Sequence, residues 1–241
     1  MDAFEGDRVR VVRGRAPTRE ADRTVTAAML AETGRDGVPA FRAWTPHRQV
    51  AFGRRDSHAD GYEAARRAAD ERGFPPVERS VGGRAVAYTG ATTLAFAHVV
   101  PTEDIRTGLD DRYDAATESV VDALASLGVA ATPGEPPNSF CPGAHSVQAD
   151  GKLCGIAQRV RSDAALVSGV VVAGEREELA AVLAPVYEAL DVPFDPETVG
   201  SVAESGGPSD PEETRRALEA SFVGDAEWDV TDAAAFVSDE E

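Results

Sequence analysis

The chain has 241 residues, of which 42% are hydrophobic and 27% are charged, and its formal net charge is −18. This length suits one large domain, or one domain with a small C-terminal appendage, and no segment approaches the roughly 18 consecutive apolar residues of a membrane-spanning helix. The negative charge argues against nucleic acids and anionic membranes as partners, because both are bound through clustered lysine and arginine.

The first half of the chain predicts short strands that alternate with helices. Alternating apolar residues mark the strands, and Thr18 is a suitable N-cap for a first helix that should end near Gly34. Pro46 separates two of the strands. The expected segments are strands at residues 8–13, 40–45 and 49–53 and helices at residues 18–34 and 61–73.

A glycine-containing loop at residues 80–84 follows a short strand that begins at Val77. Two apolar runs come next, at residues 85–88 and 93–100. Thr89-Gly90 lies between them and has the chemistry of a turn. This pattern predicts a β-hairpin.

An amphipathic helix and an antiparallel sheet are predicted in the middle of the chain. Apolar residues recur at steps of three or four from Tyr113 to Leu127, with acidic residues on the opposite side. Further on, Asp150-Gly151 favours a type I′ turn between two strands, because both central positions of that turn need positive φ. The expected strands of this meander are at residues 146–149, 152–161 and 164–172.

The C-terminal part reads as two helices, at residues 175–190 and 212–222, followed by an acidic and weakly ordered tail. Together these elements predict an α+β fold of mixed, mostly antiparallel sheets flanked by helices. The predicted organisation is a main domain at residues 1–190, a small helical appendage at residues 191–224 and a tail at residues 225–241.

Lys152 is the only lysine among 24 basic residues. Lysine and arginine are interchangeable at most surface positions, so a lysine that is left alone points to a site that arginine cannot serve. Lysine carries a compact charge on a thin stem, which suits a narrow pocket beside a carbonyl or phosphate. The strand that follows the lysine contains Gly155 and Ala157, whose small side chains let a ligand approach. We therefore expect Lys152 in a functional site, with chance survival on the surface as the alternative.

Two cysteines differ in their surroundings. Cys141 lies in a loop before Pro142-Gly143, where a thiolate could attack an acyl carbonyl if a neighbouring cation favours it. Lys152 and His145 are the candidates for that neighbour, and His145 is also a candidate base. The alternative is that Cys141 is a small, buried apolar residue. Cys154 lies in the middle of a strand and is expected to be a buried structural residue.

Two segments, at residues 79–86 and 150–159, resemble the signatures of the lipoate–protein ligase and octanoyltransferase family. The resemblance covers residues 40–172 and implies a biotin/lipoate ligase-like fold, with residues 1–190 as the catalytic domain. It also implies that Lys152 contacts the acyl carbonyl. The residues it places around the substrate are Arg79, Gly82, Gly83, Ala85, Gly155 and Ala157.

The segment around Cys141 is similar to the subgroup that moves octanoyl or lipoyl groups between proteins. In that subgroup the cysteine forms a thioester and no cofactor is required. The resemblance implies that Cys141 is the nucleophile. The acceptors it implies are lipoyl domains, namely the glycine cleavage H protein and the E2 subunit of 2-oxoacid dehydrogenases.

Two other functions stay open. In an ATP-dependent lipoate–protein ligase, ATP and Mg would be the cofactors, Lys152 would hold lipoyl-AMP, and Cys141 would be incidental. In a non-catalytic module, the chain would bind lipoylated partners without turnover. For all three functions we expect no metal ion bound by a cluster of the protein's own side chains.

The acidic composition has two explanations that the sequence leaves open. A surplus of carboxylates, with arginine in place of lysine, suits a halophilic protein, because concentrated salt screens the repulsion between its charges. A GC-rich genome would also favour arginine over lysine. With two cysteines and no apolar signal segment near residue 1, we expect a cytoplasmic protein.

Overall fold

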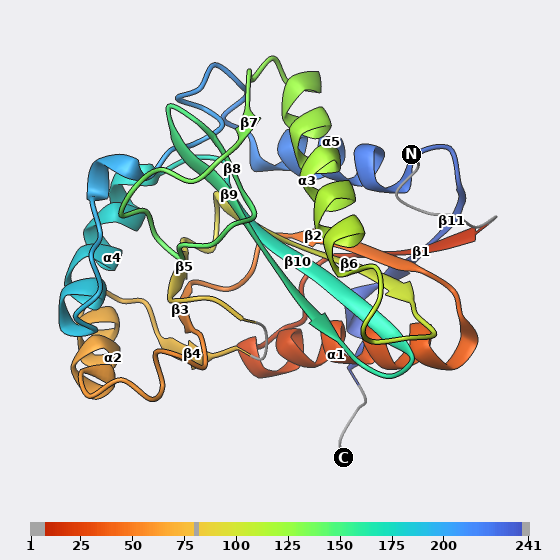
Figure 1. The fold of residues 1–241 in the computed structure, drawn as a ribbon, viewed down its shortest axis with the longest axis horizontal. Helices are drawn as coiled ribbons and strands as arrows, with labels where there is room; N and C mark the ends of the chain where they lie inside the picture. The colour runs from red at the N-terminus through yellow and green to blue at the C-terminus, as the bar shows by residue number, and fades with distance from the viewer. Residues whose placement is uncertain (1–7, 80–81, 238–241) are drawn as a thin grey trace.

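The computed structural model describes residues 8–79 and 82–237, and two β-sheets organise this part of the chain (Figure 1). The strands of the larger sheet are, in spatial order, β11 (Glu227–Asp232), β1 (Arg8–Arg13), β2 (Ala40–Trp44), β6 (Thr93–Pro101), β10 (Ala164–Val172), β9 (Gly151–Val160), β8 (Ser146–Ala149) and β7 (Thr132–Pro133). The smaller sheet has the order β4 (Pro76–Glu78), β3 (Gln49–Phe52) and β5 (Val86–Tyr88).

Helices cover both sheets. They are α1 (Arg19–Asp36), α2 (Tyr62–Asp70), α3 (Leu109–Ser126), α4 (Arg176–Ala189) and α5 (Pro211–Val223), with short 3₁₀ helices η1 (Pro196–Thr198) and η2 (Ala233–Phe236). β1 is parallel to its two neighbours and β3 is parallel to β4, whereas the other strand pairs are antiparallel. The α+β class with mixed, mostly antiparallel sheets is therefore confirmed.

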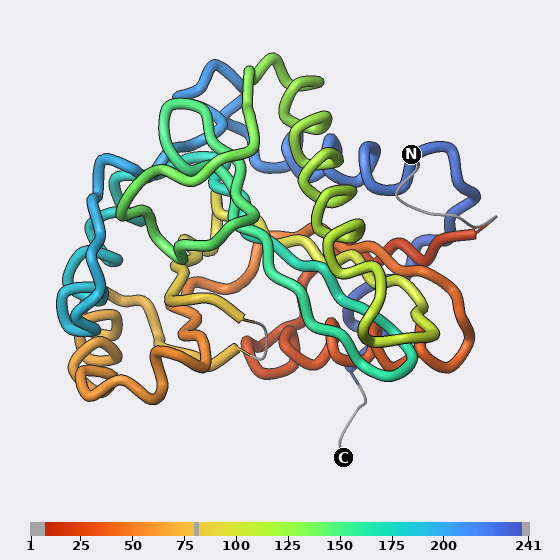
Figure 2. Tube along the Cα trace, in the orientation of Figure 1, coloured from red at the N-terminus to blue at the C-terminus, as the bar shows by residue number. Residues whose placement is uncertain are grey.

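Both faces of the larger sheet carry buried side chains, and β6 shows why. Successive side chains of a strand point to opposite faces. Leu94 and Phe96 accordingly pack into the core beneath α3 and α5, while Ala97 and Val99 pack into a separate core beneath α1. A third core joins the smaller sheet, α2 and α4 to Ala95 and other residues of the larger sheet. Figure 2 shows α2 and α4 beside the smaller sheet and away from α1.

Several elements begin where the sequence predicts. The side chain of Thr18 accepts a hydrogen bond from the backbone N–H of Ala21 at 3.1 Å and caps α1. The helix continues past the expected end at Gly34, and Gly37, with φ 73°, is its C-cap. β1 and β10 have the predicted bounds, and β8, β9 and β10 form the predicted antiparallel meander. Local capping and periodicity are therefore sufficient to place these elements.

The predicted hairpin at residues 85–100 is wrong. β5 pairs with β3 in the smaller sheet, whereas β6 pairs with β2 and β10 in the larger one. The hydroxyl of Thr89 accepts hydrogen bonds from the N–H groups of Ala91 and Thr92, so the chain does turn here. Turn chemistry fixes the local bend, but burial of the flanking strands decides where each strand pairs.

The turn at Asp150-Gly151 forms, but it is not of type I′. Gly151 has φ 133°, whereas Asp150 is not among the residues with positive φ. A β-carbon on Gly151 would lie 2.7 Å from the backbone nitrogen of Gly200, so a neighbouring segment passes close to this turn. The ladder between β8 and β9 also has a register shift next to the turn, between Val147 and Gln148, which changes its geometry.

The C-terminal segment is more ordered than predicted. Residues 227–232 form β11, which extends the sheet along β1, and η2 follows. Arg8 pairs with Asp229, and the guanidinium of Arg13 lies 5.1 Å from the ring centroid of Trp228. The acidic segment expected to be a weakly ordered tail therefore forms an edge strand that pairs with β1, while residues 238–241 lie outside the described part.

α5 shares the main core, since Leu218 and Phe222 lie in the same cluster as residues of β2 and β6. The ring of Phe222 stacks on that of Phe41 with centroids 4.8 Å apart. The division of the chain at residues 190 and 224 stays a prediction about domain organisation. Within the described residues, no helix is long and apolar enough to cross a membrane.

Candidate active site

A cavity of about 1390 Å³ lies against the larger sheet, and residues of α1 and of the smaller sheet also line it. Among the strand residues that line it, several have small side chains, namely Ala95, Ala97, Gly155, Ala157 and Ser168. Larger residues at these positions would fill the space. Cavities of this kind, largely apolar with a few polar groups, are typical of small-molecule sites.

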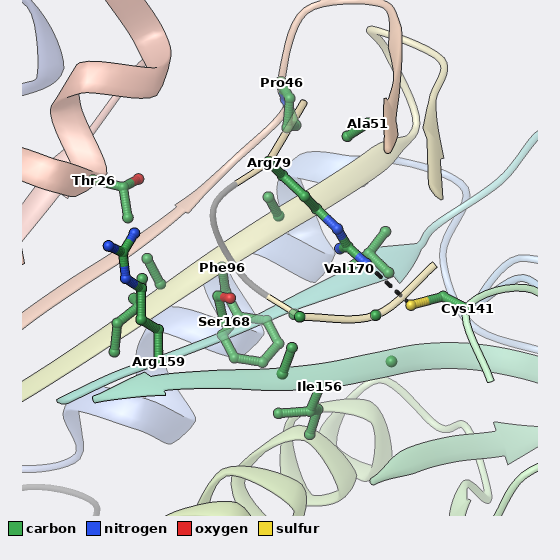
Figure 3. A pocket seen from close by; sticks show the side chains of 18 of the residues that line it. Thr26, Pro46, Ala51, Arg79, Phe96, Cys141, Ile156, Arg159, Ser168 and Val170 are labelled. Atoms are coloured by element: carbon green, nitrogen blue, oxygen red, sulfur yellow. Dashed lines mark hydrogen bonds between the residues drawn. The ribbon is translucent and has the colours of Figure 1, made fainter. Parts of the chain in front are cut away.

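Cys141 lies at one end of this cavity, in the loop between β7 and β8 (Figure 3). Its side chain is partly buried, and its backbone has φ 44°, in the left-handed region that non-glycine residues seldom adopt. Nη2 of Arg79 donates a hydrogen bond to Sγ of Cys141 at 3.2 Å. Arg159 and Thr26 lie at the other end of the cavity in the same view. The thiol of Cys141 therefore lies in the cavity in contact with a cationic side chain.

The glycine loop approaches the same thiol. Nη2 of Arg79 also donates to the carbonyl of Arg84 at 2.7 Å, which ties the loop to the end of β4. Gly83 has φ 97°, and a β-carbon there would lie 2.5 Å from Nη2 of Arg79 and 2.6 Å from Sγ of Cys141. Only glycine therefore lets this backbone lie beside the thiol. Ser80 and Val81 of the predicted loop lie outside the described residues.

The charge of Arg79 is supported by its neighbours. Burial lowers the pKa of Arg79, but the negative forms of Cys141 and Tyr88 raise it by more, so its pKa lies above the ordinary value. The guanidinium therefore stays protonated beside the thiol.

Lys152 lies behind the Cys141 loop and does not line the cavity. Its side chain is fully buried, and Nζ donates to the carbonyls of Phe140 and Cys141, each at 2.9 Å. The carboxylate of Glu135 balances the charge at 3.0 Å, and Ser139 donates a further hydrogen bond to this carboxylate. The expected neighbour of the thiol is therefore different: Arg79 contacts Sγ, whereas Lys152 holds the backbone of the loop.

A buried tyrosine joins the two loops. The hydroxyl of Tyr187, on α4, accepts a hydrogen bond from the N–H of Cys141 and donates one to the carbonyl of Ala85 at 2.8 Å. Burial and the nearby negative form of Cys141 raise the pKa of Tyr187 well above its usual value, so the hydroxyl keeps its proton. Ala85 is buried and does not line the cavity, and its carbonyl is bound by Tyr187, so its contact with substrate stays a prediction.

His145 lines the cavity wall. Its ring stacks on that of Tyr113, with centroids 3.7 Å apart and an interplanar angle of 4°. This contact fixes the plane of the imidazole. Its role as a base stays a prediction.

Cys154 is a structural residue, as expected. It is fully buried in the core beneath α3, and burial raises its pKa to about 12 even though the charge of Lys152 lowers it. Both cysteines are free thiols. The described residues hold no group of three or more His, Cys, Asp or Glu that could bind a metal ion.

Arginines surround the opening of the cavity. We define the arginine rim as five exposed residues that line the cavity and have no ion-pair partner among the described residues: Arg19, Arg23, Arg54, Arg55 and Arg159. Two exposed acidic residues, Glu20 and Glu78, also lie there. On a chain with a net charge of −18, this rim is a local concentration of positive charge. It attracts anionic groups to the entrance.

The structure places most of the predicted site residues around one cavity. These are Arg79, Gly82, Gly83, Cys141, His145, Gly155 and Ala157. Sequence reasoning missed Glu135, Tyr187 and the arginine rim. For Glu135 a signal was available, because a buried lone lysine needs a carboxylate partner.

Comparison with known families gives one match that spans most of the chain. The model described as "Lipoyl protein ligase A/B catalytic domain" matches residues 22–223. Two curated relatives are named octanoyl-[GcvH]:protein N-octanoyltransferase. The protein from Exiguobacterium sp. is 31% identical over 120 residues, which are 49% of this chain and 42% of that protein. The protein from Kyrpidia tusciae is 34% identical over 136 residues, which are 54% of this chain and 45% of that protein. The chain thus spans about half the length of these relatives.

Solved structures share the fold across nearly the whole chain. A lipoate-protein ligase A bound with ATP superposes with a TM-score of 0.77 at 20% identity, covering 95% of this chain and 92% of that one. The putative lipoate protein ligase Ta0514 from T. acidophilum, with bound lipoic acid, gives a TM-score of 0.73 at 20% identity, with 98% and 93% coverage. The lipoate ligase-like fold expected from the sequence is therefore confirmed.

Proposed function

Because the chain belongs to the family of lipoyl protein ligase A/B catalytic domains, we propose that it transfers an octanoyl or lipoyl group to a protein lysine through a thioester on Cys141. One observation carries this proposal: Sγ of Cys141 lies in the cavity, 3.2 Å from the guanidinium of Arg79. A thiol that merely fills space has no need of a cation beside it. The names of the curated relatives support the same reaction.

The reaction proceeds in two balanced steps. The Cys141 thiolate attacks the acyl carbonyl of the donor, the C–N bond to the donor lysine breaks, and the departing amine takes up a proton. The acceptor amine then attacks the thioester, loses a proton as the new C–N bond forms, and releases the thiolate. Arg79 stabilises the thiolate at the start and at the end of the cycle.

Charge on the carbonyl oxygen has to be stabilised in both steps. Backbone N–H groups near Gly82 and Gly83 are our candidates, because this loop passes beside Sγ. For Lys152 to contact the acyl carbonyl, as the family resemblance implies, Nζ has to release the carbonyl of Phe140 or Cys141. In the described geometry Lys152 acts on the substrate only through the loop that it holds.

Lipoyl domains are the proposed acceptors, with the glycine cleavage H protein and the E2 subunit of 2-oxoacid dehydrogenases as examples. The relatives are named for GcvH, and one structural neighbour is an archaeal lipoate ligase described with its E2 lipoyl domain. We propose that the acceptor places an acidic surface against the arginine rim while its lysine enters the cavity. The free thiols of the chain fit a reducing cytoplasm.

An ATP-dependent lipoate ligase is the second candidate. A cavity of about 1390 Å³ bordered by arginines has the size and charge to hold a nucleotide with its phosphates. This reaction requires ATP and Mg, whereas thioester transfer requires neither. The two candidates therefore differ in what they consume.

The test measures acyl transfer with and without ATP. An octanoylated H protein and an unmodified E2 lipoyl domain are incubated with the enzyme, and acylated E2 domain is measured by mass spectrometry. We expect transfer without ATP in the wild type and none in Cys141→Ala. Lipoate-driven exchange of pyrophosphate into ATP that persists in Cys141→Ala would contradict the thioester reaction. Binding of the acylated partner without any transfer would identify a non-catalytic module.

A further inference from the structure

Every polar group of Cys141 is bound by a side chain from a different part of the chain. Arg79, after β4, donates to the thiol, and Lys152, on β9, donates to the carbonyl. Tyr187, on α4, accepts from the backbone N–H. The residue is therefore fixed at three points, although it lies in a loop.

The backbone of Cys141 needs this support. A non-glycine residue with φ 44° is in a sparsely populated conformation, which persists only where the surroundings hold it. Arg79 holds the side chain and Lys152 holds the carbonyl. The N–H is held by Tyr187, whose own hydroxyl proton is bound to the carbonyl of Ala85.

The Tyr187 hydroxyl connects two loops that are far apart in the sequence. Ala85 follows directly after the glycine loop, and Gly83 of that loop lies against Sγ of Cys141. The ring of Tyr187 is fully buried in the core of the smaller sheet and lies 5.0 Å from the ring of Phe194. Only its hydroxyl reaches the site, so packing and hydrogen bonding are separable in this residue.

We propose that Tyr187 is a positioning residue, whose hydroxyl holds Cys141 and the glycine loop at the separation that the thiol needs to react. The proposal rests on Cys141 being the reactive thiol of the proposed function. It has a mechanistic consequence, because the N–H of Cys141 is already bound and does not serve the acyl oxyanion. The oxyanion must then be stabilised by other groups, among which the glycine loop is nearest to the thiol.

Tyr187→Phe tests the proposal, because it removes the hydroxyl and keeps the ring. Tyr62→Phe is the matched control: its hydroxyl donates to Glu78 at 3.0 Å, and Tyr62 does not line the cavity. The rate of alkylation by iodoacetamide is followed by intact-protein mass spectrometry under native conditions. Cys154 is an internal control for folding, since it is fully buried and reacts only if the core opens.

We expect alkylation of Cys141 to slow by about tenfold in Tyr187→Phe, while Cys154 stays protected. A misplacement of about 1 Å in an active site costs roughly 100-fold in rate, so kcat for acyl transfer should fall by about 10-fold to 100-fold with KM nearly unchanged. Tyr62→Phe should match the wild type in both measurements.

Two results would overturn the proposal. Wild-type alkylation and kcat in Tyr187→Phe would show that the hydroxyl does not position the thiol. Exposure of Cys154 in this variant would show that the hydroxyl supports the core and not the loop. Failure of the thioester reaction is a separate result, because it appears as transfer that survives Cys141→Ala, whereas alkylation reports on the thiol itself.

Discussion

Two groups of residues around the cavity, the contacts of Cys141 and the arginine rim, are built in opposite ways. At the inner end, Cys141 and its partners are buried or partly buried, and hydrogen bonds hold them from three elements. At the entrance, the arginine rim is exposed and has no ion-pair partner among the described residues. Fixed geometry is what a chemical step requires, whereas unpaired charge at an entrance serves attraction and docking.

This contrast assigns separate tasks to the two regions. Changes at the inner end should alter kcat or the stability of the fold, because they disturb groups that are desolvated and hydrogen-bonded. Changes at the rim should alter KM for the protein partner and its salt dependence, because exposed charges act through the solvent. A rim variant that lowers kcat alone would break the distinction.

Gly83→Ala should have the largest effect among the variants that keep all site side chains. The new β-carbon would lie within 2.6 Å of both Arg79 and Cys141, so the glycine loop and the thiol have to separate. We expect kcat to fall by roughly 100-fold. Gly73→Ala is the matched control, because Gly73 also has positive φ, at 72°, but open space around its β-carbon position. Equal loss of activity in both variants would show that backbone strain, and not the contact with the thiol, causes the effect.

The next largest effect is expected for Lys152→Met, and it should appear as a loss of stability. The change keeps the length of the side chain but removes the cation that pairs with Glu135 and the donor to the carbonyls of Phe140 and Cys141. Loss of one partner of a buried ion pair is strongly destabilising, and Glu135 is partly exposed, so we expect a loss of about 2 kcal/mol in the free energy of unfolding. Urea denaturation measures it.

A second change sharpens the interpretation of Lys152. Glu135→Gln in the Lys152→Met background removes the unpaired negative charge, so it should restore part of the lost stability. No recovery would mean that the lysine acts through the loop carbonyls alone.

The rim should give the smallest effect. Arg54→Glu combined with Arg55→Glu reverses two rim charges, and we expect KM for the acceptor domain to rise by about tenfold with kcat within twofold. The difference from the wild type should shrink as salt is added. Arg67→Glu with Arg72→Glu is the matched control, since both are exposed, have no ion-pair partner among the described residues and do not line the cavity. An equal rise in KM in this control variant would show that the effect comes from the net charge of the protein and not from the rim.

The sequence predicts the inner end better than the entrance. Its motifs name Arg79, the glycine loop and Cys141, and the meander that carries Lys152 follows from strand periodicity. Each of these motifs lies within a single strand or loop, so it can be recognised without knowledge of the fold. The structure then brings these segments to one cavity.

The remaining features depend on contacts between distant segments. The hydroxyl of Tyr187 reaches Cys141 across 46 residues of sequence, and nothing in the pattern of α4 distinguishes this tyrosine from a core residue. The rim combines α1, the segment after β3 and β9, so its charge becomes visible only in the folded chain. β11 escapes prediction for a similar reason. Its sequence is acidic, and the partner with which it pairs is the distant strand β1.

The central claim is that Cys141 carries the acyl group between two proteins, and the mass of the enzyme tests it most directly. The enzyme is incubated with an octanoylated donor domain without an acceptor, and intact and peptide masses are recorded. We predict one octanoyl group on the peptide that contains Cys141, which hydroxylamine removes and an acceptor domain discharges. Transfer to the acceptor at full rate with no adduct on Cys141, under conditions that trap thioesters, would contradict the account.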